Sequence, residues 1–153
     1  MRNLIPIEEE EERRLKALAE YRILGTKPES CYDDVTKIAA STCDVPISLM
    51  TLVDRDKQWF KSKVGLEINE TPRDWSFCTY AIKENSPLIV QDAYQDERFI
   101  NNPLVTGDPK IRFYAGFPLK NQDGNKLGTL CVIDRKPGNL SPKQFNVMEL
   151  LSK

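Results

Sequence analysis

The residue best equipped for covalent chemistry is Cys78, which lies in the stretch TPRDWSFCTYAI shortly after Arg73. A thiolate is a nucleophile, and a neighbouring arginine favours ionisation of a thiol. A thiol redox cycle also needs a partner thiol, but no cysteine occurs between Thr79 and Leu130. We therefore interpret Cys78 as a small buried residue beside a binding site, and we predict no catalytic residue.

The sequence contains no histidine. This absence excludes a Ser-His-Asp triad, a Cys-His dyad, a phosphoaccepting histidine and any metal site that uses imidazole. Asp92, Asp96 and Glu97 lie close together, but they lack the spacing of an EF-hand loop, so we predict no metal site. These observations favour a binding protein over an enzyme, with no bound cofactor.

Arg73 and Arg98 are candidates for holding an anionic ligand, because a guanidinium can grip a carboxylate or phosphate with two parallel hydrogen bonds. Aromatic side chains could add stacking surface to such a site: Trp59, Phe77, Phe99 and Tyr114. Both sets also have a structural interpretation. The aromatic rings would then fill the core, and the arginines would tie loops down by pairing with Asp74, Asp92, Asp96 or Asp108.

The composition is typical of one soluble globular domain. The chain has 153 residues, 40% of them hydrophobic, and a net charge of −1. Because there is no basic excess to neutralise phosphates, nucleic acid is not an expected partner. No apolar run approaches the roughly 18 residues of a membrane span, and the acidic N-terminus lacks the apolar core of a signal peptide. We therefore expect a cytoplasmic protein whose other cysteines are free thiols.

Helical periodicity is found at both ends of the chain. Residues 1–25 are predicted to form an acidic helix with a narrow apolar stripe at Leu15, Leu18 and Ala19. A second helix is predicted within KPESCYDDVTKIAASTCDV and a final one within SPKQFNVMELLSK, where Ser141 is a suitable N-cap. The stripe of the first helix needs a partner, which could be the domain itself or the same helix of a second chain.

Strands are predicted between these helices. PISLMTLVDRDKQWFKSKVG alternates around a polar turn, which predicts a hairpin of strands Ile47–Val53 and Gln58–Val64, with Phe60 and Ser62 on one face. PLIVQD, IRFYAGFPLK and KLGTLCVID are further strands. TPRDWSFCTYAI should run into a short helix, and the polar segment 92–110 should be a functional or capping loop. Hairpins and helices in this order favour an antiparallel sheet covered by helices, an α/β (α+β) sandwich.

These elements resemble a GAF domain of the bacterial sensory subgroup found ahead of diguanylate cyclases and histidine kinases. The resemblance lies in ordered motifs: RLKALAEYRILGTKPES, TPRDWSFCTYAI, PLIVQDAYQDERFINNPLVTGDPKIRFYAGFPL and LGTLCVIDRKPGNLSPKQ. It implies an antiparallel sheet of about six strands, with helices on one side and a ligand pocket on the other. The pocket roof would be Thr71–Ile82 and Asp92–Lys110. It also implies a single domain over 1–153, with a dimer or signalling helix at 1–25 and a GAF core at 28–153.

The resemblance further implies a binding site and a regulatory function. The candidate ligand-binding residues belong to the expected floor and roof of the pocket: Trp59, Phe60, Arg73, Phe77, Cys78, Asp92, Arg98, Phe99, Tyr114 and Cys131. They would bind an unknown small molecule without catalysis. Binding would be coupled to an output domain, such as a diguanylate cyclase or histidine kinase, or to the partner of a homodimer formed through the terminal helices.

Other GAF-like classes resemble this sequence less closely. Free methionine-(R)-sulfoxide reductases have a cysteine at the position of Cys78, but their attacking cysteine falls in the region of residues 92–110, which contains none here. Phytochrome domains that attach a bilin carry Cys and His where this chain has NNPLVTGDPKIRF, so a bilin is not expected. DAYQDERFINNP does not match the cyclic-nucleotide signature, which leaves such a ligand as an analogy of fold. The alternatives to a sensor are a reductase of this type and a purely structural dimerisation module.

Overall fold

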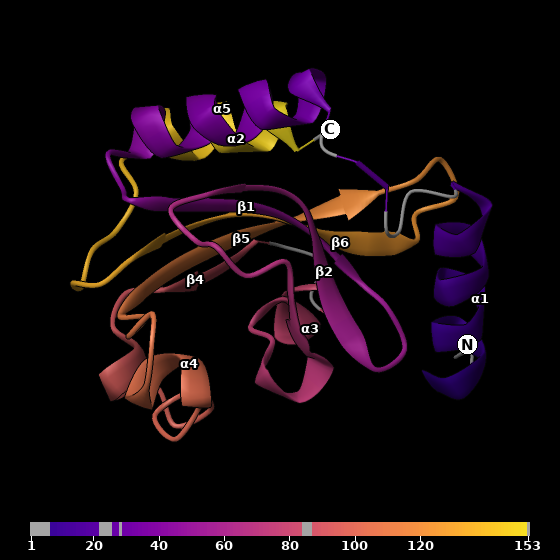
Figure 1. Ribbon diagram of the computed structural model, residues 1–153, viewed down its shortest axis with the longest axis horizontal. Helices are drawn as coiled ribbons and strands as arrows, with labels where there is room; N and C mark the ends of the chain where they lie inside the picture. The colour runs from indigo at the N-terminus through magenta and orange to yellow at the C-terminus, as the bar shows by residue number, and fades with distance from the viewer. Residues whose placement is uncertain (1–6, 22–25, 28, 84–86, 153) are drawn as a thin grey trace, which may run out of the picture.

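A six-stranded antiparallel sheet forms the centre of the described part of the chain (Figure 1). The computed structural model describes residues 7–21, 26–27, 29–83 and 87–152. The strand order is β3-β2-β1-β6-β5-β4, and every neighbouring pair is antiparallel. The strands are β1 Ile47–Val53, β2 Lys57–Val64, β3 Glu70–Pro72, β4 Leu88–Val90, β5 Phe113–Lys120 and β6 Lys126–Asp134. The predicted α+β sandwich is confirmed.

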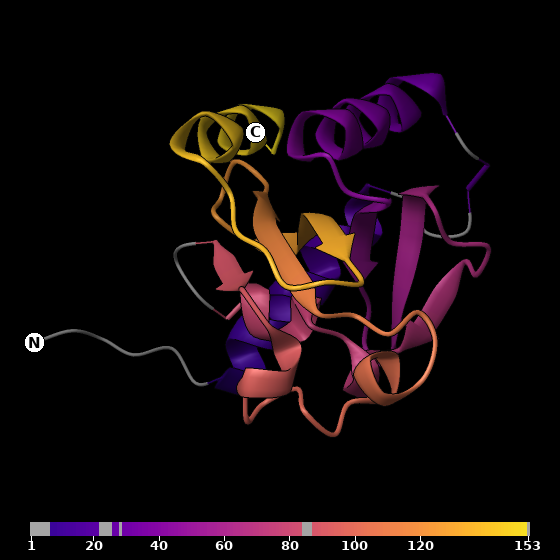
Figure 2. The same ribbon diagram turned by 90° about the vertical axis from the view of Figure 1, so that its left-hand side faces the viewer.

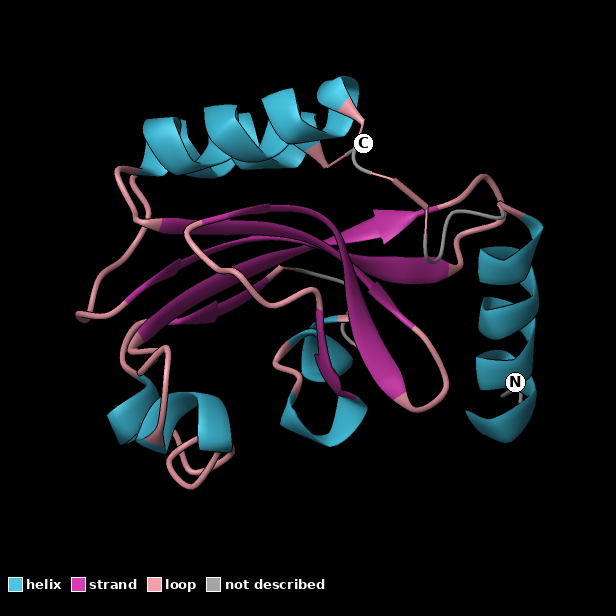
Figure 3. Cartoon of the chain, viewed as in Figure 1, coloured by secondary structure: helices cyan, strands magenta, loops and turns pink. Residues whose placement is uncertain are grey.

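Two long helices, α2 Ser30–Cys43 and α5 Pro142–Leu151, cover one face of the sheet (Figures 1 and 3) and lie side by side there (Figure 2). Met148 of α5 is fully buried in the cluster between this pair and the sheet. Ser141 caps α5 as predicted. Its hydroxyl accepts a hydrogen bond from the amide of Gln144, whose side-chain oxygen accepts one from the amide of Ser141.

The opposite face of the sheet carries short elements, which we call the roof and define as residues 71–82 and 92–110 (Figure 2). They include the 3-10 turns η1 Arg73–Trp75 and η2 Ala93–Gln95 and the short helices α3 Cys78–Ala81 and α4 Pro103–Thr106. The polar segment 92–110 is more than a loop, because it buries Phe99 and Val105 completely. Asp92 caps η2 and Asn102 caps α4. A large hydrophobic cluster lies between roof and sheet.

The N-terminal helix α1, Ile7–Glu20, stands at one end of the sheet (Figure 1). Leu18 is buried in a separate cluster with Leu52 of β1. Leu15 and Leu18 of the predicted stripe are buried, whereas Ala19 is exposed and Ala17 is buried in its place. The buried side of this helix therefore packs against its own domain. Residues 22–25, which the sequence assigns to the end of this helix, lie outside the described residues. Within the described ranges, no helix has the length and apolar character needed to cross a membrane.

A bulge in β2 changes the predicted arrangement of its side chains. The pairing with β1 passes from Met50–Ser62 directly to Thr51–Phe60, so Lys61 is an extra residue. Phe60 consequently faces the roof, whereas Ser62 forms hydrogen bonds with α2 on the other side. The prediction that Phe60 and Ser62 share a face is wrong, because local alternation gives no sign of an inserted residue.

Strand β3 was not predicted from the sequence. It consists of Glu70–Pro72 and pairs with residues Lys57 to Trp59 at the edge of the sheet. Three residues that include a proline carry little strand signal, and proline is tolerated at an edge because the edge amide needs no ladder partner. With β3, the sheet reaches the number of strands that the family resemblance implies.

Candidate functional site

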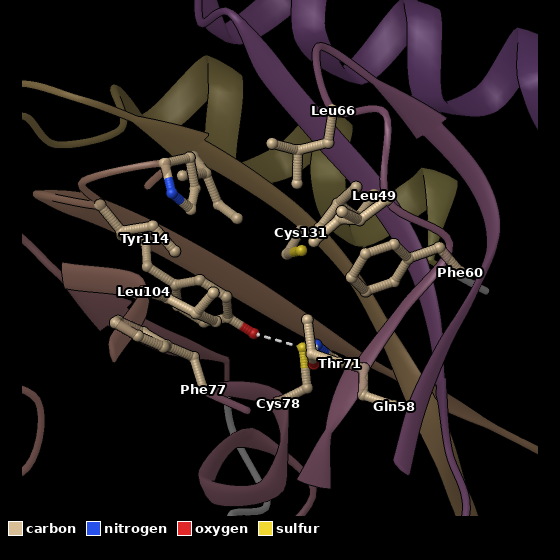
Figure 4. Close-up of a pocket in the computed structure, with 14 residues that line it drawn as sticks. Leu49, Gln58, Phe60, Leu66, Thr71, Phe77, Cys78, Leu104, Tyr114 and Cys131 are labelled. Carbon is tan, nitrogen blue, oxygen red and sulfur yellow. Dashed lines mark hydrogen bonds between the residues drawn. The ribbon is translucent and has the colours of Figure 1, made fainter. Parts of the chain in front are cut away.

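A small cavity lies between the sheet and the roof (Figure 4). Its volume is about 20 Å³, which is room for roughly one water molecule. Most of the wall is apolar, with contributions from Leu49, Phe60, Leu66, Phe77, Leu104 and Ile111. The polar lining residues are Gln58, Thr71, Cys78, Tyr114 and Cys131. Among the described residues, no charged side chain lines the cavity.

Gln58 of β2 is held firmly at the edge of this cavity. Its Nε2 donates to the hydroxyl of Thr71 at 3.1 Å, and its Oε1 accepts from the hydroxyl of Ser76 at 2.7 Å. All three side chains are buried, where an unmade hydrogen bond would be costly. The carboxamide therefore fastens the roof to the sheet.

Cys78 joins a second polar cluster at the inner end of the cavity. Its sulfur lies 3.1 Å from the hydroxyl of Tyr114 (Figure 4). It also lies 2.9 Å from the hydroxyl of Thr129. The Thr129 hydroxyl lies 3.1 Å from the Thr51 hydroxyl, which also accepts a hydrogen bond from the backbone amide of Thr129. Gly116 makes this possible, because a Cβ there would lie 2.6 Å from Cζ of Tyr114. Without a side chain at Gly116, the phenol can reach Cys78.

Burial and hydrogen bonding act in opposite directions on this cluster. Burial raises the pKa of the Cys131 thiol well above its ordinary value, and it does the same for the phenol of Tyr114. Burial also acts to raise the pKa of Cys78, but hydrogen bonds from Cys131, Thr129, Thr51 and Tyr114 outweigh it and lower that pKa to about 6. Cys78 is only 2% exposed. It therefore lacks the access, and within the described lining also the neighbouring cation, that are typical of a reactive thiol.

Half of the candidate residues from the sequence come together in the cavity lining: Phe60, Phe77, Cys78, Tyr114 and Cys131. They come from the floor strands and from the first roof segment, as the family resemblance implies. Sequence reasoning missed most of the aliphatic lining. Leu49 and Ile133 were visible only as the buried positions of strands, and Leu66 lies in the loop between β2 and β3, where no pattern marks it.

The other candidates lie outside the lining. Trp59 packs toward α1, and Phe99 is buried behind Phe77, with the two ring centroids 4.0 Å apart. The charged candidates form ion pairs instead: Arg98 with Asp96, Asp92 with Arg112, and Arg73 with Glu11. The structure thus does not assemble the two arginines around one space. In each pair, the carboxylate accepts the hydrogen bonds that the guanidinium could otherwise donate to a ligand.

Arg73 connects the roof to α1. Its guanidinium donates to Glu11 of α1 and, at 3.2 Å, to the carbonyl oxygen of Asp54. Glu11 also accepts two hydrogen bonds from Arg14, each at 2.9 Å, and Arg14 donates to the carbonyl oxygen of Val53 at 2.6 Å. A single carboxylate therefore lies between two arginines and holds together α1, the end of β1 and the roof.

We expect acid to loosen this contact between α1 and the roof. Burial acts to raise the pKa of Glu11, but hydrogen bonds and charges from Arg14 and Arg73 outweigh it and lower the pKa from 4.5 to about 2. Because the folded-state pKa is depressed, the stabilisation is complete above the unfolded value and is lost as pH falls toward the folded value. Fluorescence of Trp59, which packs with α1, should report the loss in an acid titration of a Trp75→Phe background.

Two variants of α1 separate this contact from general acid effects. Glu11→Gln should remove the acid transition. Glu12→Gln should keep it, because Glu12 pairs with Arg55 in an exposed position and does not contact the roof. An identical acid titration in Glu11→Gln and the parent protein would contradict the assignment.

The architecture and the site define the class of the protein. A six-stranded antiparallel sheet has long helices on one face and a roofed internal cavity on the other. The chain belongs to the GAF domain family, whose model matches residues 27–153. Helix α1 precedes the matched residues.

A relative with an assigned activity is a cyclic di-GMP phosphodiesterase of Pseudomonas aeruginosa. It is 40% identical over 145 residues, which cover 94% of this chain and 25% of that protein. The chain therefore spans about a quarter of the length of that relative. Because the alignment covers so much of this chain, it extends into the segment that precedes the matched GAF residues.

Two solved structures illustrate the breadth of this fold. The GAF domain of a phosphoenolpyruvate-protein phosphotransferase from Coxiella burnetii has a TM-score of 0.67 and 12% identity, covering 94% of this chain and 89% of that chain. A type II free methionine-R-sulfoxide reductase from Thermoplasma acidophilum has a TM-score of 0.66 and 13% identity, covering 89% and 90% of the respective chains. At these identities the likeness shows the fold alone.

Proposed function

We propose that this domain binds a small molecule beneath its roof, without catalysing a reaction, and passes the resulting shift through Arg73 to α1. The Arg73–Glu11 pair carries this proposal, because it joins the wall of the cavity to a helix that precedes the matched GAF residues. Membership of the GAF family supports a regulatory function. The relative from Pseudomonas aeruginosa gives a further reason, since a domain like this one accounts for 25% of a phosphodiesterase.

A short series of hydrogen bonds links the cavity wall with Arg73. Gln58 accepts from the hydroxyl of Ser76, whose amide donates to the carbonyl oxygen of Arg73 at 2.9 Å. The hydroxyl of Thr79, next to Cys78, donates to the same carbonyl at 3.3 Å. A ligand that moves Gln58 or α3 would therefore move the turn that carries Arg73. It shifts the equilibrium only if it binds one arrangement of this turn more tightly than the other.

We infer that the shift then reaches an output domain or a second subunit. An enzyme of cyclic di-GMP metabolism or a histidine kinase would suit the family, and we expect such partners in the cytoplasm. In a homodimer through the terminal helices, Ala17 and Leu18 of α1 would not be available, because they pack with Leu52. Leu150 of α5, which is 67% exposed, is better placed for such a contact.

A thiol-dependent reductase is the competing function. The observation in its favour is that Cys78 and Cys131 both line the cavity of a fold shared with a methionine sulfoxide reductase. Two observations weigh against it. Cys78 is enclosed, and residues 92–110 contain no cysteine.

The proposal is tested by a thermal-shift screen of metabolites, together with mass spectrometry of compounds that copurify with the protein. We expect at least one compound to raise the Tm and to change amide hydrogen exchange in α1. In Arg73→Met the compound should still raise the Tm, but the response of α1 should be lost. Arg98→Met is the matched control, because Arg98 is a roof arginine paired with Asp96, and it should retain both responses.

Two results would overturn the proposal. A screen in which no compound of any chemical class raises the Tm would remove the binding function. Turnover of free methionine-R-sulfoxide with a thiol reductant, abolished by Cys78→Ser, would make the domain an enzyme.

A further inference from the structure

We propose that the cavity takes an uncharged, mainly apolar small molecule with a single hydroxyl or carbonyl group, which enters by displacing Leu66. The inference rests on the proposed function and narrows the chemical class of the ligand. It excludes nucleotides, phosphates and carboxylates, which are the anions that Arg73 and Arg98 suggest when the sequence alone is considered.

An anion in this cavity would find no positive charge. No cationic side chain is among the described lining residues. Arg73 is directed to Glu11 on α1, and Arg98 pairs with Asp96 within the roof. An anion that entered would give up its hydration without an ion pair in return, and this costs far more than burying a neutral group.

The cavity is also expected to bind cations weakly. No carboxylate lines the cavity in the described part of the chain. The strongest acceptors that a cation could use are Oε1 of Gln58 and the sulfur of Cys78, and both are already engaged. Oε1 of Gln58 accepts from Ser76, and the sulfur of Cys78 lies at hydrogen-bonding distance from the hydroxyls of Tyr114 and Thr129. These hydroxyl groups compensate the negative charge that the lowered pKa of Cys78 allows. The lining therefore favours neutral molecules over both kinds of ion.

One edge of the cavity can meet a single polar group. Nε2 of Gln58 carries two hydrogens, and the hydroxyl of Thr71 accepts one of them. A ligand oxygen at this edge can accept the other. The remaining wall around it is aliphatic or aromatic, as Figure 4 shows for Phe60, Leu49 and Leu104. An apolar body with one oxygen acceptor matches this distribution.

The least constrained wall is the one formed by Leu66 and Ile68, since Ile68 is 45% exposed. Cys78 and Tyr114 are tied to each other, and Phe77 is stacked on Phe99, so these walls are fixed by specific contacts.

Leu66, in contrast, is a partly buried side chain of the loop between β2 and β3 that packs against the cluster. Lys63 holds the backbone of this loop by donating to the carbonyl oxygens of Glu67 and Ile68, so the movement is a rotation of the Leu66 side chain. The cavity is too small for more than a water molecule while Leu66 occupies this position. Displacing Leu66 would enlarge the cavity next to Ile68, whose side chain already reaches solvent.

The test compares three probes of nearly equal size and shape: benzyl alcohol, benzoate and benzylamine, which are neutral, anionic and cationic at pH 7. Each is titrated into the full chain and followed by protein-detected NMR. We expect benzyl alcohol to perturb resonances of the lining residues and to bind more than about a hundredfold more tightly than either ion. Leu66→Ala should tighten this binding by about tenfold.

Leu140→Ala is the matched control, because Leu140 is also partly buried but packs in the cluster on the other face of the sheet. It should leave the affinity unchanged. Binding of benzoate or benzylamine as tight as that of benzyl alcohol would overturn the ligand class. Equal effects of Leu66→Ala and Leu140→Ala would overturn the route of entry. A charged compound from the metabolite screen that competes for this cavity would refute the inference while the sensing function survives, whereas a cavity that binds no compound of any charge would refute both.

Discussion

Gly128→Ala should destabilise the domain by about 3 kcal/mol or more, because it overpacks the centre of the sheet. Gly128 of β6 lies opposite Leu52 of β1 and Leu119 of β5. A Cβ at this position would collide with the carbonyl oxygen of Thr51, and it would lie 2.7 Å from the carbonyl carbon of Thr51 and 2.8 Å from Cα of Leu52. These are backbone atoms of a central strand, which cannot rotate away as the end of a side chain can. The strands β1 and β6 would have to separate.

The damage should extend to the cavity. The hydroxyl of Thr51 accepts a hydrogen bond from the backbone amide of Thr129 at 3.2 Å. The hydroxyl of Thr129 in turn lies beside the sulfur of Cys78, which lines the cavity. Urea denaturation measures the loss of stability. Gly138→Ala is the control, because its Cβ would sit 3.6 Å from the ring of Phe113, in ordinary contact, and it should change stability by no more than about 0.5 kcal/mol. Equal stabilities of the two variants would mean that β1 and β6 yield more readily than their geometry implies.

The sheet could be predicted from the sequence because most of its strands carry a local signal. β1, β5 and β6 are apolar stretches bounded by polar turns, and the end of the chain combines an N-cap at Ser141 with helical periodicity. The two failures have the same physical origin. The bulge at Lys61 and the short strand Glu70–Pro72 depend on pairing with a neighbouring strand, and such pairing is not contained in the periodicity of one segment.

The site was harder to predict than the sheet, and the arginines show why. Arg73 was expected either to hold a ligand or to pair with a nearby aspartate. Its partner is Glu11, which lies 62 residues away in the sequence and became available only because α1 docks at the end of β1. The size of the cavity was equally hidden. It is the space left after Phe77, Tyr114 and their neighbours have packed, and packing is decided by volumes rather than by patterns.

Phe77→Ala should cost about 3–5 kcal/mol and enlarge the cavity. Phe77 is 2% exposed, and its ring is stacked on that of Phe99 and tilted against that of Tyr114, with centroid distances of 4.0 and 5.0 Å. Truncation removes both contacts and leaves a void where the wall was, so the loss of burial and the cost of the void add. Benzene should restore part of the lost stability in thermal denaturation, because it can occupy the space of the missing ring.

Tyr80→Ala provides the comparison, since Tyr80 also contacts Phe99, edge-on at 5.1 Å, but is 38% exposed. It should cost about 1 kcal/mol or less and show no benzene effect. Equal losses, or equal recovery with benzene, would contradict the assignment of Phe77 to the cavity wall.

The same variant also tests the link to α1. Phe77 directly follows Ser76, whose amide donates a hydrogen bond to the carbonyl oxygen of Arg73. Because Arg73 pairs with Glu11 of α1, filling the enlarged cavity with benzene should change hydrogen exchange in α1. If benzene raises the Tm of Phe77→Ala while exchange in α1 stays the same, the cavity and the helix are uncoupled. The domain would then bind without signalling through Arg73.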